Sequence, residues 1–470
     1  MLIFGSITDE IKALEAKYAE KLVVADWLNR RLVSNQGNKK VGFLNWFGLK
    51  EGFSYDLVMK LMQRSGIQRD DVFLDPFSGA GTSLFAASNK GLKPIGIELL
   101  PIGKFLHETR MAAFQVDLND LSKEVKRILS SDWKKLEPSN EFRFRHLTIT
   151  QGAFPQDTEN EMANYLGYVA AIKNKEVRQL LMFACFSVLE RISYTSKDGQ
   201  YLRWDKRGGR VRAGNYLKPK VSRFHEAISQ TLSMMLSTVE GRKLLSVNED
   251  QAEKDILLIS GSALEKLPEL DSNSVDLIIS SPPYCNRYDY TRTYALELAF
   301  LGVDNRNLKE LRQRMLSCTV ENKSKEGWLR GMYEARGRLD AFERARSTFL
   351  ENKSLTSILE GLKVKMENGE LNNKGIYRMV YNYFYEHSFI IQEMARIMKQ
   401  SGKIYYINDN VQYAGVPVPV DLILSEFAET SGLTVNKIYY LKRGKGNSSQ
   451  QMGLHGRGEQ RKCVYEWERV

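Results

Sequence analysis

A strand, a glycine-rich turn, a helix and a second strand follow one another between residues 71 and 98. This order limits the possible folds more than any other feature of the chain. The apolar stretch 71–75 predicts the first strand, and the turn at 76–82 contains two glycines. Residues 94–98 predict the second strand. Such a β-α-β unit places its two strands parallel in one sheet, so we expect an α/β fold.

The chemistry of this unit favours a nucleoside ligand. Gly79 and Gly81 allow the backbone to approach a ligand closely, because glycine has no side chain. Glu98, the last residue of the second strand, is placed to accept hydrogen bonds from a ribose diol. The turn has no lysine after its glycines, as a phosphate-binding P-loop would, and it lacks the third glycine of a dinucleotide fingerprint. A nucleoside without phosphates fits this pattern better.

An apolar strand that ends abruptly lies further along the chain. Residues 275–279 predict a buried strand, and it must end before Pro282 and Pro283, which cannot donate hydrogen bonds to a sheet. Ser281 and Tyr284 flank this rigid pair. At the carboxyl end of a strand they offer a hydroxyl, fixed carbonyls and an aromatic face to a flat, amino-bearing ring. A strand-ending turn with a packing tyrosine explains these four residues equally well.

Two segments resemble a known enzyme family. Residues 75–82, DPFSGAGT, resemble the S-adenosylmethionine motif of amino-group DNA methyltransferases, which commonly reads DPFxGxGT. Residues 281–284, SPPY, resemble the family's catalytic motif, in which Ser, Asp or Asn precedes two prolines and an aromatic residue. The resemblance implies a Rossmann-like methyltransferase fold with a mostly parallel seven-stranded sheet and largely helical insertions. It also implies S-adenosyl-L-methionine as the cofactor and double-stranded DNA as the substrate.

The resemblance assigns roles to individual residues. Glu98 falls where the family keeps its ribose-binding acid, and Ser262, in a strand expected at 255–263, falls where Asp is common. The full cofactor set implied is Phe53, Ser54, Asp75, Pro76, Phe77, Ser78, Gly79, Ala80, Gly81, Thr82, Glu98 and Ser262. The catalytic set implied is Ser281, Pro282, Pro283 and Tyr284.

The catalytic motif also indicates which amine is methylated. In the family, Ser before the two prolines usually accompanies N4 of cytosine, and Asp or Asn usually accompanies N6 of adenine. We expect an N4-cytosine enzyme, with N6-adenine as the alternative. Ser281 and the Pro282 carbonyl would accept hydrogen bonds from the amine, and Tyr284 would stack on a base flipped out of the duplex. A restriction-modification role and a companion restriction endonuclease are implied by the family alone.

Cys285 follows the catalytic motif directly and is expected to be a packing residue. Methylation at carbon 5 of cytosine needs a nucleophilic thiolate, which in that family follows a single proline. No Pro-Cys pair occurs in the chain. The sequence therefore favours direct transfer to an amine.

Basic residues gather in two polar stretches, and the net charge is +11. Between residues 197 and 223 there are nine lysines and arginines against two aspartates, with aromatic residues among them. The loop 443–460 is also basic and glycine-rich. Such stretches suit contact with nucleic acid, and a solvated loop is the alternative for each. The expected DNA contacts are Arg203, Trp204, Lys206, Arg207, Arg210, Arg212, Lys445, Asn447 and Arg457.

The remaining sequence divides the expected sheet into parts. Residues 1–104 would hold an N-terminal helix and the cofactor-binding half, 251–302 the catalytic half, and 378–470 the last strands. The segment 105–250 would be a helical and basic insertion, a candidate for target recognition. The segment 303–377 would be a charged helical insertion, and its many arginines read as a solvated face because acids are interspersed.

Other classes of protein fit less well. Four scattered cysteines without a CxxC pair argue against a zinc site or disulfides and fit a reducing cytoplasm, and no metal is expected. No apolar run reaches the length of a membrane span, and residues 8–33 predict an amphipathic helix rather than a signal peptide. An RNA base-amine methyltransferase would carry an RNA-binding domain. A non-enzymatic DNA-binding protein would leave SPPY and Glu98 unexplained.

Overall fold

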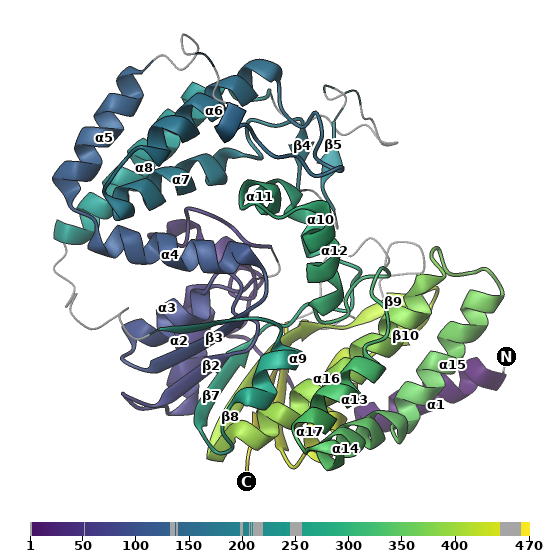
Figure 1. Ribbon diagram of the computed structural model, residues 1–470. Coiled ribbons are helices and arrows are strands. Elements are labelled where there is room, and N and C mark those ends of the chain that lie inside the picture. The colour runs from purple at the N-terminus through teal and green to yellow at the C-terminus, as the bar shows by residue number, and fades with distance from the viewer. Residues whose placement is uncertain are drawn as a thin grey trace.

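The computed structural model describes residues 2–50, 52–131, 137, 140–197, 201–205, 207, 209, 220–244, 256–441 and 462–470. Eight strands of this described part form the central sheet. They are β1 Leu22–Val24, β2 Val72–Asp75, β3 Lys93–Glu98, β6 Leu257–Ser260, β7 Val275–Ser280, β8 Met398–Asp409, β11 Thr434–Tyr440 and β12 Lys462–Glu468. Their order is β1-β11-β12-β8-β7-β2-β3-β6 (Figure 1). Only β12 runs antiparallel to its neighbours, so the expected α/β fold with a mostly parallel sheet is confirmed.

The helices and the small hairpins surround this sheet. The first insertion contains α4 Pro101–Gln115, α5 Leu118–Ser130, η3 Asn140–Phe142, α6 Gln156–Ala170, α7 Lys175–Val188 and α8 Phe224–Leu244, with strands β4 Thr195–Ser196 and β5 Arg203–Trp204. The second contains α12 Asn305–Arg314, α13 Glu326–Ala335, α14 Leu339–Leu350 and α15 Lys353–Glu367. The others are α1 Leu2–Lys17, η1 Asn35–Lys40, α2 Tyr55–Ser65, α3 Thr82–Asn89, α9 Ala263–Lys266, η5 Leu267–Glu269, α10 Tyr290–Thr293, α11 Ala295–Phe300, α16 Gly375–Ile397 and α17 Val420–Thr430, and β9 Val411–Tyr413 pairs with β10 Val416–Val418.

The sheet has one strand more than the seven expected, and the N-terminal helix is shorter than expected. Helix α1 ends at Lys17, so the prediction of a helix over 8–33 was wrong in its second half. Residues 22–24 instead form β1, which pairs in parallel with β11 at the far end of the chain. Helical periodicity cannot show that a short apolar stretch finds a strand partner so distant in sequence.

The β-α-β unit forms as the sequence predicts. Strands β2 and β3 are parallel neighbours, and α3 lies between them along the chain. Phe73 belongs to the apolar cluster that contains residues of α2 and α3, whereas Leu74 belongs to the separate cluster that contains residues of α16 and α17. Because successive side chains of β2 are buried in opposite layers, the turn that follows this strand has a rigid base.

The first insertion forms a helical lobe that stands above the sheet in Figure 1. Its core contains Phe105 of α4 and Phe183 and Phe186 of α7, and Tyr294 and Leu298 from beyond the catalytic motif complete it. The lobe therefore packs directly against the segment that follows SPPY.

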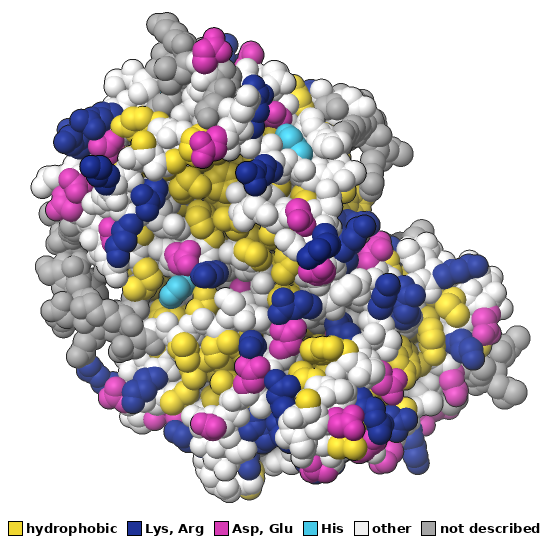
Figure 2. Space-filling model, viewed as in Figure 1, with side chains coloured by type: hydrophobic (Ala, Val, Ile, Leu, Met, Phe, Trp, Pro, Cys, Tyr) yellow, Lys and Arg dark blue, Asp and Glu magenta, His cyan; other side chains and the backbone are white. Residues whose placement is uncertain are grey.

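The second insertion packs beside α16, and α15 lies against α1 near the N-terminus (Figure 1). Figure 2 shows Lys and Arg side chains interspersed with Asp and Glu on the viewed face of this part of the molecule. Exposed pairs within one helix are common here, such as Arg306 with Glu310 and Arg344 with Asp340. These pairs agree with the solvated face that the sequence suggested, whereas other arginines of the insertion have a different role, described below.

The described residues contain no helix that is long and apolar enough to cross a membrane. Among the same residues no group of three or more His, Cys, Asp or Glu side chains is arranged to hold a metal ion.

Candidate active site

A pocket opens where β2, β3, β6 and β7 end. Ten of the twelve expected cofactor residues line it: Phe53, Asp75, Pro76, Phe77, Ser78, Gly79, Ala80, Thr82, Glu98 and Ser262. Ser281 and Pro283 of the catalytic motif line the same pocket. The carboxyl ends of parallel strands are where open α/β sheets bind ligands. The two motifs, about 200 residues apart in sequence, therefore meet at one site.

The glycine turn shapes one wall of the pocket. Gly79 and Gly81 both have positive φ, of 52° and 71°, which other residues adopt only with strain. The amide of Gly79 donates a hydrogen bond of 2.8 Å to Oε2 of Glu98. A Cβ atom on Gly103, in α4, would lie 2.4 Å from Cγ of Glu98 and 2.5 Å from the Gly79 carbonyl. Because Gly103 has no side chain, there is room for the Glu98 carboxyl beside the glycine turn.

Glu98 is held at the pocket wall by the backbone. Its Oε1 accepts a hydrogen bond of 2.6 Å from the amide of Leu100, in addition to the bond from Gly79. Burial raises the pKa of the Glu98 carboxyl to about 7, and the two backbone donors partly oppose this increase. An acceptor carboxylate beside a turn that a backbone can approach closely, with no lysine in the turn, fits a nucleoside better than a phosphate ligand.

Asp75 joins the strands beneath the pocket. It is buried, and its Oδ1 accepts hydrogen bonds from the Ser280 hydroxyl (2.6 Å) and the Phe77 amide (3.0 Å). Its Oδ2 accepts a hydrogen bond from the hydroxyl of Ser83, in α3. Burial raises the pKa of Asp75 to about 6, and these three donors limit the increase. Asp75 therefore connects the glycine turn to the strand that leads into SPPY.

The catalytic motif follows β7 as the sequence predicts, because the strand ends at Ser280. The hydroxyls of Ser281 and Tyr284 share a hydrogen bond of 2.8 Å. Ser281 lines the pocket, whereas Tyr284 is only 1% exposed. In this conformation the aromatic face expected to stack on a base is covered, and the Ser281 hydroxyl is held by its neighbour.

Comparison with known proteins identifies the family. No family model matches the chain. The type II methyltransferase M.BsoBI of Geobacillus stearothermophilus is 42% identical over an alignment of 470 positions, gaps included, which covers 97% of this chain and 91% of the relative. The type II methyltransferases M.AvaI of Nostoc sp. and of Anabaena variabilis are each 44% identical over 464 residues, or 97% of this chain and 92% of the relative. The chain belongs to the type II methyltransferases. The fold and the pocket described above are thus those of a methyltransferase.

Four of the expected cofactor and catalytic residues do not line the pocket of this methyltransferase: Tyr284, described above, and Ser54, Gly81 and Pro282. Ser54 is fully buried as the N-cap of α2, where its hydroxyl accepts a hydrogen bond of 3.1 Å from the Leu57 amide. Gly81 completes the glycine turn, and its carbonyl accepts a hydrogen bond of 3.2 Å from Arg110. Pro282 is buried between Ser281 and Pro283.

Cys285 of the methyltransferase is fully buried, and burial raises the pKa of its thiol well above the ordinary value. Its carbonyl accepts a hydrogen bond from the hydroxyl of Tyr413. A buried, protonated thiol is a poor nucleophile. The geometry agrees with the expectation that Cys285 packs rather than reacts.

Sequence reasoning missed several residues of the pocket. Those that no motif indicated include Asn35, Leu49, Lys50, Leu100, Ile102, Gly103, Gly261, Ala263, Tyr290, Met315 and Leu316. Gly261 follows β6 directly and carried a signal, because a glycine after a strand often marks a close approach. Met315 and Leu316 carried none, since they belong to the second insertion, which the sequence presented as a separate charged segment.

The expected DNA contacts of the methyltransferase are only partly described. Arg203 and Trp204 form β5, which pairs with β4 in a small hairpin. Arg207 is paired locally with Asp205, which leaves its side chain 30% exposed. The others, Lys206, Arg210, Arg212, Lys445, Asn447 and Arg457, lie outside the described residues.

Proposed function

We propose that this chain is a DNA methyltransferase that transfers a methyl group from S-adenosyl-L-methionine to the exocyclic N4 of a cytosine in duplex DNA. It would act as the modification enzyme of a restriction-modification system. The observation that supports this most is that Ser281 and Pro283 share one pocket with Gly79 and Glu98. A nucleoside cofactor and an amine-binding motif would thus lie side by side, as direct transfer requires.

The residues of the pocket have separate tasks in this proposal. When bound, S-adenosyl-L-methionine supplies an electrophilic methyl group on a sulfonium. Glu98 accepts hydrogen bonds from the ribose diol, and the glycine turn at Gly79 lets the backbone approach the nucleoside. Asp75 keeps the turn and the catalytic motif at a fixed separation through Ser280. The chain thereby removes most of the translational freedom that two reactants would otherwise have to lose.

Ser281 and Pro282 act on the target amine. The lone pair of a cytosine amine is delocalised into the ring, so the nitrogen is a weak nucleophile. The Ser281 hydroxyl and the Pro282 carbonyl accept hydrogen bonds from the amine, which favours tetrahedral geometry at the nitrogen and directs its lone pair toward the methyl group. These neutral acceptors orient the amine, and no covalent bond to the base forms.

Tyr284 is the residue proposed to stack on the flipped base. Because its ring is 1% exposed in this conformation, stacking requires the ring or a covering segment to move when DNA binds. The basic residues between 197 and 223 and in the loop 443–460 are the proposed contacts to DNA, and a companion endonuclease is the proposed functional partner.

Incubation with S-adenosylmethionine labelled with tritium in its methyl group tests the proposal. Duplex DNA and folded RNA of mixed sequence would be offered in parallel, and the methylated nucleoside would be identified by mass spectrometry. We expect label in DNA, recovered as N4-methylcytosine. Recovery of N6-methyladenine alone would show that the base assignment is wrong. Label only in RNA, or DNA binding without label, would support the two rival functions instead.

A further inference from the structure

Two residues of the second insertion lie on the wall of the cofactor pocket. Met315 and Leu316 directly follow α12, and both side chains are buried, with 9% and 2% exposure. Ser262 and Ala263, where β6 leads into α9, line the same pocket. An insertion that the sequence presents as separate thus completes the site from the outside.

One ion pair ties these two parts of the wall together. Arg314, the last residue of α12, donates from Nε to Oε1 of Glu265 (2.9 Å) and from Nη2 to Oε2 (2.6 Å). Glu265 Oε2 also accepts a hydrogen bond of 3.2 Å from the Ser262 amide. The pair with Arg314 lowers the pKa of Glu265, against the effect of burial. Two parallel bonds fix the orientation of the guanidinium, which a single ion pair does not.

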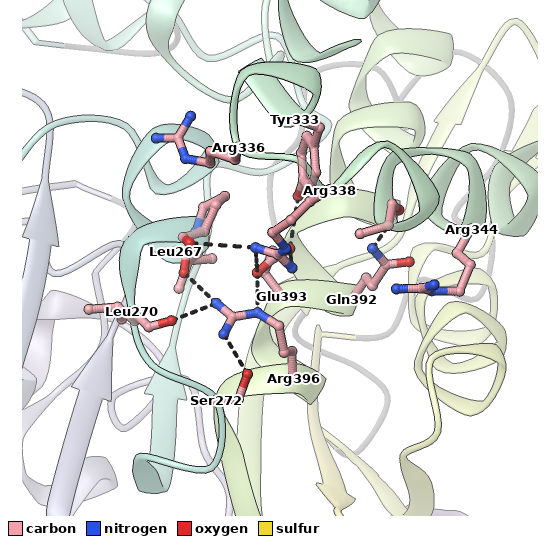
Figure 3. Close-up of polar contacts among 12 residues, drawn as sticks. Leu267, Leu270, Ser272, Tyr333, Arg336, Arg338, Arg344, Gln392, Glu393 and Arg396 are labelled. Carbon is pink, nitrogen blue, oxygen red and sulfur yellow. Dashed lines mark hydrogen bonds and ion pairs between the residues drawn. The ribbon is translucent and has the colours of Figure 1, made fainter. Parts of the chain in front are cut away.

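Other arginines hold residues 267–270, which follow α9 and continue from the part of the wall formed by Ser262 and Ala263. Arg396 of α16 donates to the carbonyls of Leu267 (3.0 Å) and Leu270 (2.7 Å), and Figure 3 shows its guanidinium pointing toward both residues. Arg338 of the second insertion pairs with Glu393 of α16 and donates to the Pro268 carbonyl. Residues 267–270 are therefore held by Arg338 and Arg396, independently of Arg314. Arg314 differs because it directly precedes Met315 and Leu316, which line the pocket.

We propose that Arg314 is a positioning residue of the cofactor site. By pairing with Glu265 it holds Met315 and Leu316 against Ser262 and Ala263, and so slows the release of the bound nucleoside cofactor. The inference rests on the proposed function, because it takes an adenosyl compound as the ligand. It goes further by giving the second insertion a role in cofactor retention.

The chain offers a matched control on the same helix. Arg306 and Glu310 of α12 also form an ion pair, at 3.3 Å, but their side chains are 83% and 58% exposed, and neither residue is adjacent in the chain to one that lines the pocket. The side chains of Arg314 and Glu265 are 49% and 19% exposed. Since a partly exposed pair contributes modestly, we expect loss of the Arg314 pair to speed cofactor release by about three- to tenfold.

The test measures the dissociation rate of S-adenosylhomocysteine from the full chain, by competition with excess unlabelled ligand. We expect Arg314→Met to increase the rate, Arg314→Lys to give a smaller increase because it keeps charge but not the paired donors, and Arg306→Ala to leave it unchanged. The unfolding temperature of each ligand-free variant shows whether the fold is intact.

A second variant checks that Arg314 acts through its neighbour. Met315→Ala should also speed release, and the double variant with Arg314→Met should release the ligand more slowly than the product of the two single effects predicts. Equal rates for Arg314→Met and the unchanged chain, with both folded, would overturn the inference while leaving the proposed function intact. Failure of the unchanged chain to bind S-adenosylhomocysteine at all would instead overturn the proposed function.

Discussion

The hydroxyl of Ser280 donates a hydrogen bond of 2.6 Å to Oδ1 of Asp75, and this bond joins the ends of β7 and β2. Asp75 begins the glycine turn and Ser280 directly precedes the catalytic motif. The bond therefore connects the two motifs beneath the pocket. It also supplies part of the stabilisation that the buried carboxylate of Asp75 lost when it left water.

Ser280→Ala should destabilise the fold by about 1–3 kcal/mol, because it leaves a buried carboxylate short of one donor. The variant should raise the pKa of Asp75 above its present value of about 6, so the loss of stability should be larger at pH 8, where the group is ionised, than at pH 5. Urea unfolding at the two pH values measures this. Ser425→Ala is the control, since the buried Ser425 hydroxyl has no hydrogen-bond partner within the described residues. Equal effects of the two substitutions would contradict the prediction.

Cofactor affinity should increase with pH through about 7. The pKa of Glu98 is raised to about 7 in the cofactor-free pocket, so below that pH the carboxyl is protonated and accepts hydrogen bonds from a ribose diol less well. We expect binding about tenfold weaker at pH 6 than at pH 8, measured by calorimetry. Glu98→Gln should bind more weakly and without this pH dependence, and it also corrects for titration of the cofactor itself. A variant with the same pH profile as the unchanged chain would show that Glu98 is not the titrating group.

Gly103→Ala should reduce cofactor binding sharply. A Cβ atom there would lie 2.4 Å from Cγ of Glu98 and 2.5 Å from the Gly79 carbonyl, so either the acid or the glycine turn must shift, at a cost of about 1–3 kcal/mol. Gly331→Ala in α13 is the matched control, because among the described residues its added methyl group would meet no atom within 4 Å beyond its chain neighbours and the nearby backbone of its own helix, and it should stabilise the fold by about 0.5–1 kcal/mol. Both are measured by cofactor titration and thermal unfolding. Normal binding by Gly103→Ala would refute the proposed position of Glu98.

Two substitutions at Tyr284 separate its ring from its hydroxyl. Tyr284→Phe keeps the ring and removes the bond to Ser281, so it should lower kcat a few-fold, about 1 kcal/mol in the barrier, with little change in KM for DNA. Tyr284→Ala also removes the stacking face and should lower kcat/KM by a further factor of about ten or more. Cofactor affinity should be unchanged in both, since Tyr284 does not line the pocket. If Tyr284→Ala methylates DNA as well as Tyr284→Phe does, the ring has no stacking role.

The sequence predicted the parts of the fold that depend on local pattern. The β-α-β unit and the strand before SPPY form at their expected places, because periodicity, glycine turns and prolines act within a few residues. It failed where distant partners decide. Strand β1 depends on β11, and Met315 lines the pocket although it belongs to the second insertion, whose Arg314 pairs with Glu265 beside β6.

The same contrast explains what could be predicted of the site. Gly79 and Glu98 were found because motif spacing places them at strand ends. Gly103 gave no signal, since its importance is the absence of an atom beside Glu98, which only three-dimensional proximity reveals. The cover over Tyr284 was equally hidden, because exposure of a ring depends on segments from several parts of the chain.

The position of β6 has a consequence for how the protein is made. Synthesis of β3 is complete at Glu98, but β6, which pairs with its outer edge, begins only at Leu257. The helical lobe synthesised in between is also incomplete, because Tyr294 and Leu298 belong to its core. An uncovered strand edge and an unfinished apolar core must therefore both wait for the same later segment. We therefore expect nascent chains that have passed Glu98 but do not yet include Leu257 and Leu298 to need chaperones most.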